Sequence, residues 1–457
     1  MKPSLLGPAP SISARHSKAP TREARNAAVN WKCCLASSLL VVLLLASLAP
    51  AARGQETDRT WYRGNLHTHS LWSDGNDFPE MIADWYKSNG YHFLGLSDHN
   101  ILSRGERWIA ADTPQKRGAI QGIERYQARF GADGVETREV DGVAQVRLKN
   151  LDEVRGLLEE PGQFILIESE EITDSFENLP IHINATNIGE LVRPQGGSSV
   201  RDTIDANLRA VEAQRIKLGR PILPHLNHPN FGWGVSALDL AAVERERFFE
   251  IFNGHPSVRQ LGDDTHPSLE RFWDIANTLR LSHYKTAPLM GLATDDSHHY
   301  FGGQGPTPGR GWVQVRAEAL DPTKLLEAME AGDFYASTGV TLREVSWDPV
   351  KAEVRIEIAP EEGVTYEIQF IGTRRLDAAG FELTEETTPT DLPETWGAVL
   401  ETVTGTEGSF IVRDEFLYVR AVVISSKPHP NPAWSGQVEQ AWTQPMGWRL
   451  PIPATPE

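Results

Sequence analysis

Short apolar runs alternate with helical patterns from Trp61 to about Thr338, and this alternation is the strongest constraint on the fold. Repeated β and α units of this kind fold into sheets covered by helices, so the region predicts an α/β architecture. Seven runs are predicted strands: residues 62–66, 93–96, 164–167, 181–183, 222–226, 248–252 and 289–293. Predicted helices lie at residues 78–88, 200–218, 267–281 and 323–331.

Two segments depart from this alternation. Residues 136–148 read as a hairpin, because Asp141-Gly142 supplies the positive φ angles of a tight turn. From Val340 onward the pattern changes to alternating strands, for example 352–358, 365–371, 409–412 and 417–424, without a comparable helix signal. We therefore expect an α/β barrel-type unit over 52–339 and a small all-β, sandwich-like domain over 340–457.

The first 51 residues have the features of a signal peptide. A basic stretch precedes the apolar run Leu35–Leu48, and Ala49-Pro50-Ala51 resembles a cleavage site. We expect export to the periplasm or the medium; the alternative is an uncleaved anchor, although the run is shorter than the ~20 residues that span a bilayer. Both cysteines, Cys33 and Cys34, lie in this segment, so the rest of the chain has neither a disulfide nor a thiolate ligand.

The charge of the chain argues against non-specific nucleic-acid binding. The formal net charge is −18, and it is −23 after residue 51. Such an acidic surface repels a phosphate backbone. Non-specific nucleic-acid binding is therefore not expected, and a stable membrane span after processing is not expected either. The partner classes that remain are a small molecule or a phosphoester, and the oligomeric state is left open.

Side chains that commonly bind metals follow most of the predicted strands. His67 and His69 follow the first strand, Asp98-His99 the second, residues 168–171 the third, His225 and His228 the fifth, and residues 295–298 the seventh. The carboxyl ends of parallel barrel strands meet on one face, where active sites are assembled. Buried carboxylates gathered there need a compensating cation, so the pattern predicts a metal centre.

In their order along the chain, these motifs resemble the polymerase and histidinol phosphatase (PHP) family of metallohydrolases. They are Asn65-Leu66-His67-Thr68-His69-Ser70 with Ser73-Asp74-Gly75, Leu96-Ser97-Asp98-His99-Asn100, Glu170-Glu171-Ile172-Thr173, His182-Ile183-Asn184, Asn227-His228-Pro229 and Thr294-Asp295-Asp296-Ser297-His298. The trailing β domain is most similar to the branch that includes exported carbaryl-hydrolase-like enzymes. The resemblance covers roughly residues 61–340.

The resemblance implies a distorted seven-stranded (β/α) barrel that holds two or three divalent ions. By the same resemblance, His67, His69 and Asp296 would bind the first ion, and Glu171 would bridge it to a second ion held by His182 and His228. Asp74, His99 and His298 would hold a third. The family commonly has Gly where this chain has Ser169, which leaves Glu168 and Glu170 as competitors of the favoured Glu171.

Several of these residues have plainer interpretations. Asp74, beside Gly75, could be a turn residue, and His182 could be a buried histidine of the core. His225, Asp295 and His299 are expected to support the ligands from behind. After residue 51, the remaining histidines, at positions 92, 255, 266, 283 and 429, are expected to be ordinary residues. Tryptophans 396, 434, 442 and 448 could form a carbohydrate platform, but packing is the favoured interpretation.

The expected activity is metal-dependent hydrolysis, with Glu171, Asp296 and Arg310 as the catalytic candidates. Imidazole and carboxylate ligands suit zinc, manganese or iron, so the metal is not fixed. Clustered ions favour a phosphoesterase, and Arg310 would bind the substrate anion unless it is a structural salt-bridge residue. The alternatives are a carbamate, ester or amide hydrolase that uses the same site, and a non-catalytic binding protein.

Overall fold

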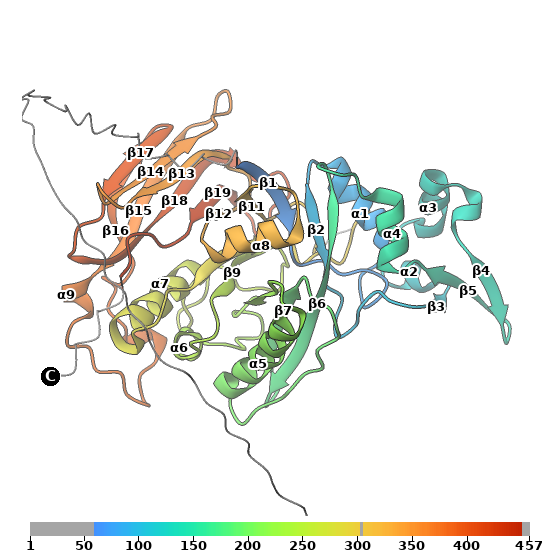
Figure 1. Cartoon of the computed structure of the whole chain (residues 1–457), viewed down its shortest axis with the longest axis horizontal. Helices are drawn as coiled ribbons and strands as arrows, with labels where there is room; N and C mark the ends of the chain where they lie inside the picture. The colour runs from blue at the N-terminus through green and yellow to red at the C-terminus, as the bar shows by residue number, and fades with distance from the viewer. Residues whose placement is uncertain (1–58, 302–304, 450–457) are drawn as a thin grey trace, which may run out of the picture. The chain divides into compact units, whose positions relative to one another are not determined.

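The computed structural model describes residues 59–301 and 305–449. The predicted signal peptide, residues 1–51, lies outside the described residues. Among the residues described, no helix combines the length and the apolar character needed to cross a membrane. The described chain is one compact unit of mixed α/β structure (Figure 1).

Seven strands of the main sheet occupy the positions predicted from the sequence. They are β1 (Thr60–Asn65), β2 (Phe93–Leu96), β6 (Ile165–Phe176), β7 (Leu179–Thr186), β8 (Leu223–Leu226), β9 (Phe248–Asn253) and β10 (Met290–Thr294). Strands β1, β2 and β6 run parallel, as do β8, β9 and β10. Strand β7 is antiparallel to both β6 and β8, because residues 177 and 178 turn the chain directly back on itself with positive φ angles. This hairpin replaces one of the expected helical crossovers.

The strand ladders do not close into the expected seven-stranded barrel within the described residues. The main sheet has the order β10-β9-β8-β7-β6-β2-β1-β11-β12-β19-β18-β15-β16, so β10 is an edge strand. The segments that follow β1 and β10 are joined by one isolated parallel bridge, between Thr68 and Ser297. On its other side β1 pairs with β11 (Trp312–Ala317), which is antiparallel and occupies the place a closing strand would need.

Helices cover the sheet, and side-chain caps mark several of their ends. They include α1 (Pro79–Ser88), α4 (Leu151–Leu158), α5 (Val200–Leu218), α6 (Ala237–Ala242), α7 (Leu269–Leu279) and α8 (Pro322–Glu330). The side chain of Ser199 accepts the amide proton of Asp202 at the start of α5, and Gly219 ends that helix in the left-handed conformation. Asp321 caps α8 in the same way. Helices α4 and α6 were not predicted, and neither were α2 (Thr113–Lys116) and α3 (Gly122–Phe130).

The hairpin predicted at residues 136–148 is part of a separate three-stranded sheet. Strands β4 (Thr137–Val140) and β5 (Val143–Leu148) pair across Asp141 and Gly142, which both have positive φ angles. Strand β3 (Arg107–Ala110) joins the other edge of β5. The hairpin predicted from the Asp141-Gly142 turn is therefore confirmed.

The C-terminal strands belong to two sheets, one of which continues the main sheet. Strands β12 (Phe334–Ser337), β19 (Val438–Thr443), β18 (Phe416–Pro428), β15 (Tyr366–Arg374) and β16 (Ala398–Thr404) extend it beyond β11, and the short helix α9 (Arg375–Ala378) follows β15. Strands β13 (Leu342–Asp348), β14 (Glu353–Ile358) and β17 (Glu407–Ile411) form the second sheet. Apolar side chains of both sheets share one core. The boundary between two domains at residues 339 and 340 stays a prediction.

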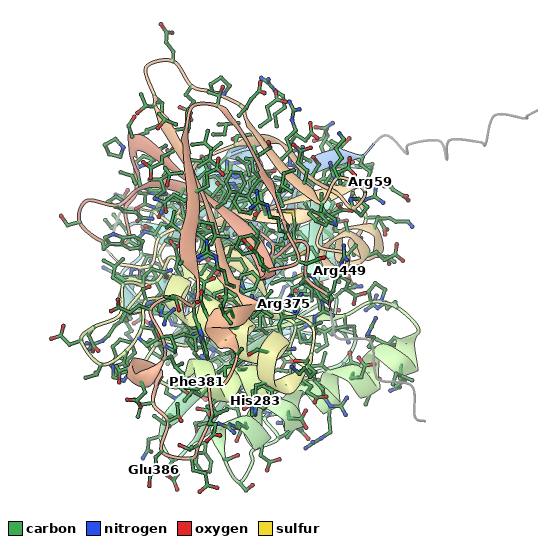
Figure 2. All side chains as sticks on the ribbon, turned by 90° about the vertical axis from the view of Figure 1, so that its left-hand side faces the viewer. Arg59, His283, Arg375, Phe381, Glu386 and Arg449 are labelled. Atoms are coloured by element: carbon green, nitrogen blue, oxygen red, sulfur yellow. The ribbon has the colours of Figure 1, made fainter. Side chains whose placement is uncertain are left out.

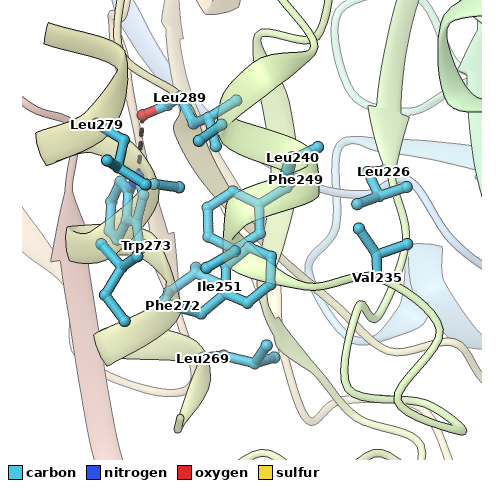
Figure 3. Packing of buried hydrophobic residues seen from close by; sticks show 14 of the residues in the cluster. Leu226, Val235, Leu240, Phe249, Ile251, Leu269, Phe272, Trp273, Leu279 and Leu289 are labelled. Carbon is cyan, nitrogen blue, oxygen red and sulfur yellow. Dashed lines mark hydrogen bonds between the residues drawn. The ribbon is translucent and has the colours of Figure 1, made fainter. Parts of the chain in front are cut away.

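The largest core lies between helices α6 and α7 and strands β8 to β10, and it reaches the C-terminal strands. The indole of Trp273 is fully buried on α7 and donates to the carbonyl oxygen of Leu289, at 2.9 Å (Figure 3). Trp396 and Trp442 pack into the same cluster and are 1% and 2% exposed. Their burial places these two tryptophans in the core and not on a surface platform.

Candidate metal centre

The segments that follow β1 and β10 are held side by side by their backbones. The amide of His69 donates to the carbonyl of Ser297, and the amide of Asp296 donates to the carbonyl of His67, both at 3.0 Å. Asp296 takes a positive φ of 47°, a conformation that aspartate tolerates better than most residues. The two segments therefore present their side chains to one common point.

Four ligand-type atoms surround that point. Nε2 of His67 lies 3.4 Å from Oε2 of Glu171 and 3.3 Å from Oδ1 of Asp296. Nε2 of His69 lies 3.3 and 3.2 Å from the same two oxygens. A tetrahedral ion with bonds of about 2.0–2.1 Å holds its ligand atoms roughly 3.3 Å apart, so the spacing fits a divalent ion.

The lack of hydrogen-bond partners for these atoms supports the same conclusion. Both Nε2 atoms and Oε2 of Glu171 are buried, and none makes a hydrogen bond to the residues the structure describes. A buried polar atom without a partner costs roughly 1–3 kcal/mol. A cation at their centre would compensate all of them at once, so the residues present fit a metal ion.

A second group lies on the other oxygen of Glu171. Oε1 of Glu171 is 2.8 Å from Nδ1 of His182 and 3.6 Å from Nε2 of His228. The same nitrogen of His228 is 4.0 Å from Oδ2 of Asp296. Because Glu171 turns one oxygen to each group, it has the position of a bridging ligand.

A third group forms around Asp74, at the more open side of the site. The Asp74 carboxylate lies 3.5 Å from Nε2 of His99, 3.4 Å from Nε2 of His298 and 3.7 Å from Nδ1 of His69. The ring of His69 is stacked between those of His99 and His298, with centroid distances of 4.4 and 4.1 Å. Asp74 keeps 55% of its side chain exposed, so this group borders solvent.

The structure thus brings all nine predicted ligands into one cluster: His67, His69, Asp74, His99, Glu171, His182, His228, Asp296 and His298. The competing carboxylates of β6 point elsewhere. Glu168 forms a bidentate pair with Arg104, at 2.6 and 2.5 Å, and Glu170 accepts the amide proton of Val192. Of the three carboxylates, only that of Glu171 lies among the histidines.

Charge and burial act together on the protonation of the cluster. Burial opposes protonation of His67, but Asp296, Glu250 and Glu171 outweigh it and raise its pKa. Burial lowers the pKa of His69 to about 3, and the neighbouring His298 and His99 act in the same direction. Burial alone would raise the pKa of Glu171, yet the surrounding imidazoles hold that pKa well below its usual value. The site therefore keeps its carboxylates ionised and His69 neutral, which are the forms that bind metals.

Glu250 is a functional residue that sequence reasoning missed. It lies fully buried on β9, its Oε1 is 2.7 Å from Nδ1 of His67, and its Oε2 accepts the amide proton of His228. His225, expected to support the ligands, lies 3.6 Å from the same carboxylate. The signal was present, because Glu250 is the only charged residue in the run Phe248–Phe252.

Arg310 is buried, and its guanidinium is partly engaged. Nη1 donates to the carbonyl of Gly254 at 2.7 Å, and Nε lies 3.4 Å from the amide oxygen of Asn431. Both of these contacts are to neutral oxygens, and neither is an ion pair. Asp295 instead accepts from the backbone amides of residues 309–311, so it shapes the loop that carries Arg310.

His255, expected to be an ordinary residue, lies beside the cluster. Its ring is 5.5 Å from that of His298 and 6.3 Å from Phe231, while Phe231 in turn packs 5.2 Å from His228. Nδ1 of His255 accepts the amide proton of Ser257 at 3.1 Å. Because an acceptor nitrogen carries no proton, Nε2 of the neutral ring is a donor, so His255 and Phe231 form a polar and an apolar wall of the site.

No protein-family model matches this chain, and no curated protein matches it in sequence. Among solved structures, one that it resembles is a two-domain protein of Bacteroides vulgatus containing a predicted PHP-like metal-dependent phosphoesterase, at 13% identity over 84% of this chain and 95% of that one, with a TM-score of 0.36. Another is a protein of Bifidobacterium adolescentis described as a candidate metal-dependent phosphoesterase, at 12% identity over 53% and 90%, with a TM-score of 0.29. At such identities and scores the likeness assigns no function to this chain.

Proposed function

We propose that this chain is a PHP-type metal-dependent hydrolase and that its substrates are phosphate esters. The observation that carries the proposal is the convergence of six histidines and three carboxylates, from six separate segments, on atom positions spaced for divalent ions. A binding protein that retained the fold alone would have no reason to keep so many buried, mutually dependent polar groups.

The residues divide among three ion positions. His67, His69 and Asp296 would hold the first ion, and Glu171 would share it with a second held by His182 and His228. Asp74, His99 and His298 would hold a third. When bound, such ions lower the pKa of a water molecule into the neutral range and neutralise charge that builds up on substrate oxygens.

The remaining side chains orient this centre. The carboxylate of Glu250 fixes the ring of His67, and Oγ1 of Thr173 lies 2.6 Å from Nδ1 of His99. Asn227 donates to Oε1 of Glu171 at 2.9 Å and so holds that carboxylate in place. Nε2 of a neutral His255 would donate a hydrogen bond to a substrate oxygen, and Phe231, which packs against His228, would limit the access of water.

Charge favours phosphate esters over carbonyl substrates. The positive charge of three adjacent ions complements a transferring phosphoryl group and exceeds what attack on a neutral carbonyl requires. The carbamate, ester or amide alternative keeps the same residues and differs only in substrate. Arg310 would add a donor for phosphate if its Nη2 faces the substrate.

A metal assay followed by a substrate panel tests the proposal. We expect two to three divalent ions per chain after desalting, and faster hydrolysis of aryl phosphate mono- or diesters than of matched aryl carbamates and acetates at equal metal loading. A carbonyl substrate that wins by more than about tenfold in kcat/KM, roughly 1.4 kcal/mol, would overturn the phosphoesterase assignment only. Less than half an equivalent of metal, with no activation by manganese or zinc, would overturn the metalloenzyme itself.

A further inference from the structure

A cavity lies at the opposite end of the strands from the metal centre. It has a volume of about 520 Å³ and is bordered by Arg247 before β9, Met290 at the start of β10 and Phe334 at the start of β12. The ligands follow the other end of β10, and the four steps of strand from Met290 to Thr294 span about 13 Å. The cavity is therefore separate from the proposed active site.

Among the charged side chains that line this cavity, Arg247 stands apart. Glu330 lies 3.3 Å from Arg215, and Asp333 is paired with both Arg316 and Arg59, so the two carboxylates of the wall are already compensated. Arg247 forms no ion pair and its side chain makes no hydrogen bond within the described part of the chain; its Nε is buried. Glu330 and Glu246 act on its charge from a distance, but neither forms an ion pair with it, so the half-buried guanidinium can accept an anion as a direct partner.

Aromatic side chains form much of the remaining wall. Trp61, Trp347 and Trp448 line the cavity from three separate segments of the chain, and Met446 lies among them. Trp61 and Trp347 also pack against the C-terminal core, which holds them in place. The exposed Arg449, labelled in Figure 2, borders the cavity at the surface. Indole faces bind flat rings and the apolar faces of sugars.

We propose that this cavity binds a small molecule that carries an oxyanion next to a flat ring, with Arg247 on the oxyanion and the tryptophans on the ring. The guanidinium presents a planar set of donors that matches a carboxylate or a phosphonate. Burial lowers the pKa of Arg247, although the charges of Glu330 and Glu246 act in the opposite direction. The inference does not depend on the proposed hydrolase activity.

Binding is tested on the metal-loaded full chain by calorimetry and tryptophan fluorescence. The probes are benzoate and phenylphosphonate, which separate a carboxylate from a phosphate-like oxyanion, with benzyl alcohol as the ring without a charge and acetate as the charge without a ring. We expect saturable binding of at least one of the first two, and binding at least tenfold weaker for benzyl alcohol and acetate.

Variants locate the site. Arg247→Gln and Trp347→Ala should each weaken probe binding by tenfold or more, whereas Arg245→Gln should not, because Arg245 pairs with Asp205 at 3.1 Å and does not line the cavity. Circular dichroism shows whether each variant is folded. If only one of the two cavity variants folds, that variant alone tests the site. Hydrolysis should be unchanged in all three.

Four results would overturn the proposal. They are the absence of saturable binding, equal binding by both cavity variants, loss of binding when the ions are removed by a chelator, and binding that appears only in a chain shortened to end at Arg449. The third would place the probes on the metal centre, and the last would make the cavity a seat for the chain's own end.

Discussion

Nδ1 of His67 lies 2.7 Å from Oε1 of Glu250, and both side chains are fully buried. The same carboxylate accepts the amide proton of His228, the amide group of Asn253 and the hydroxyl of Thr294. When the neutral ring of His67 donates from Nδ1 to Glu250, its Nε2 carries a lone pair that faces the point between Glu171 and Asp296. Glu250 is thus in a position to set the tautomer and the orientation of His67.

Replacement of Glu250 by Gln is predicted to weaken metal binding by roughly 10- to 100-fold, because outer carboxylates of this kind orient the histidine and raise its basicity. Competition with a chromogenic chelator measures the change. Glu246→Gln is a matched control, since Glu246 is also fully buried four residues earlier and touches no ligand. Equal metal affinity of the Glu250→Gln variant and the unmodified chain would refute the orienting role.

Asp296→Asn and His69→Ala are predicted to reduce turnover by about 100-fold or more while the fold is kept, because both side chains serve the ion and not the hydrophobic core. Turnover and circular dichroism are measured on the same preparations. The expected readout besides activity is the loss of bound metal from each variant. Activity above a few per cent in a folded variant would show that the residue is not an essential ligand.

Part of the ligand cluster could be predicted from the sequence because several members follow apolar runs whose ends converge, whereas the full ligand set came from the family resemblance. His67 and Asp296 illustrate this: each is adjacent to a strand that the apolar pattern identified correctly. The antiparallel course of β7 could not be predicted, since a short apolar run does not reveal its direction. Strand β11 was not predicted either. Its pairing with β1, which continues the sheet past β1, was therefore missed as well.

Glu250 and His255 show where the prediction of the site from the sequence failed. Glu250 lies within an apolar strand rather than after one, so a rule based on strand ends passes over it. His255 is separated from the strand end by a glycine and precedes a proline, and its position beside His298 depends on the path of the loop. Such long-range placement is a property of the tertiary structure and leaves no local pattern.

Glu246 gives the chain a predicted dependence of stability on pH. Burial raises the pKa of Glu246 to about 8, despite the backbone amides of Phe248 and Arg247 and the nearby charge of Arg280. Between the ordinary pKa of glutamate, about 4.3, and pH 8, the unfolded chain loses this proton while the folded chain keeps it. Stability therefore falls as pH rises through this window, at up to about 1.4 kcal/mol per unit, and levels off above it.

Urea unfolding at pH 5 and pH 8, with a chelator present in both, measures this effect. Glu246→Gln cannot ionise, so the difference in unfolding free energy between the two pH values should shrink by a few kcal/mol relative to the unmodified chain. An unchanged difference would mean that Glu246 is ionised in the folded protein at neutral pH.

The last prediction concerns the connection between helix α7 and strand β18. Asp274 forms a bidentate pair with Arg420, at 2.9 and 2.6 Å, and also accepts from the hydroxyl of Tyr418; all three side chains are buried. Asp274→Asn leaves the guanidinium of Arg420 buried without a full counter-charge, which costs about 3–5 kcal/mol. The unfolding free energy from urea titration should fall by that amount.

Asp84→Asn is the matched control for this change. Asp84 lies on helix α1 and also forms a bidentate pair, with Arg129, at 2.7 and 2.6 Å, but 52% of the Arg129 side chain is exposed. Water replaces the lost partner there, so the cost should stay within about 1 kcal/mol. If the two variants lose equal stability, burial is not what makes the Asp274–Arg420 pair important, and other contacts, such as that between Thr278 and Thr373, hold the C-terminal strands to α7.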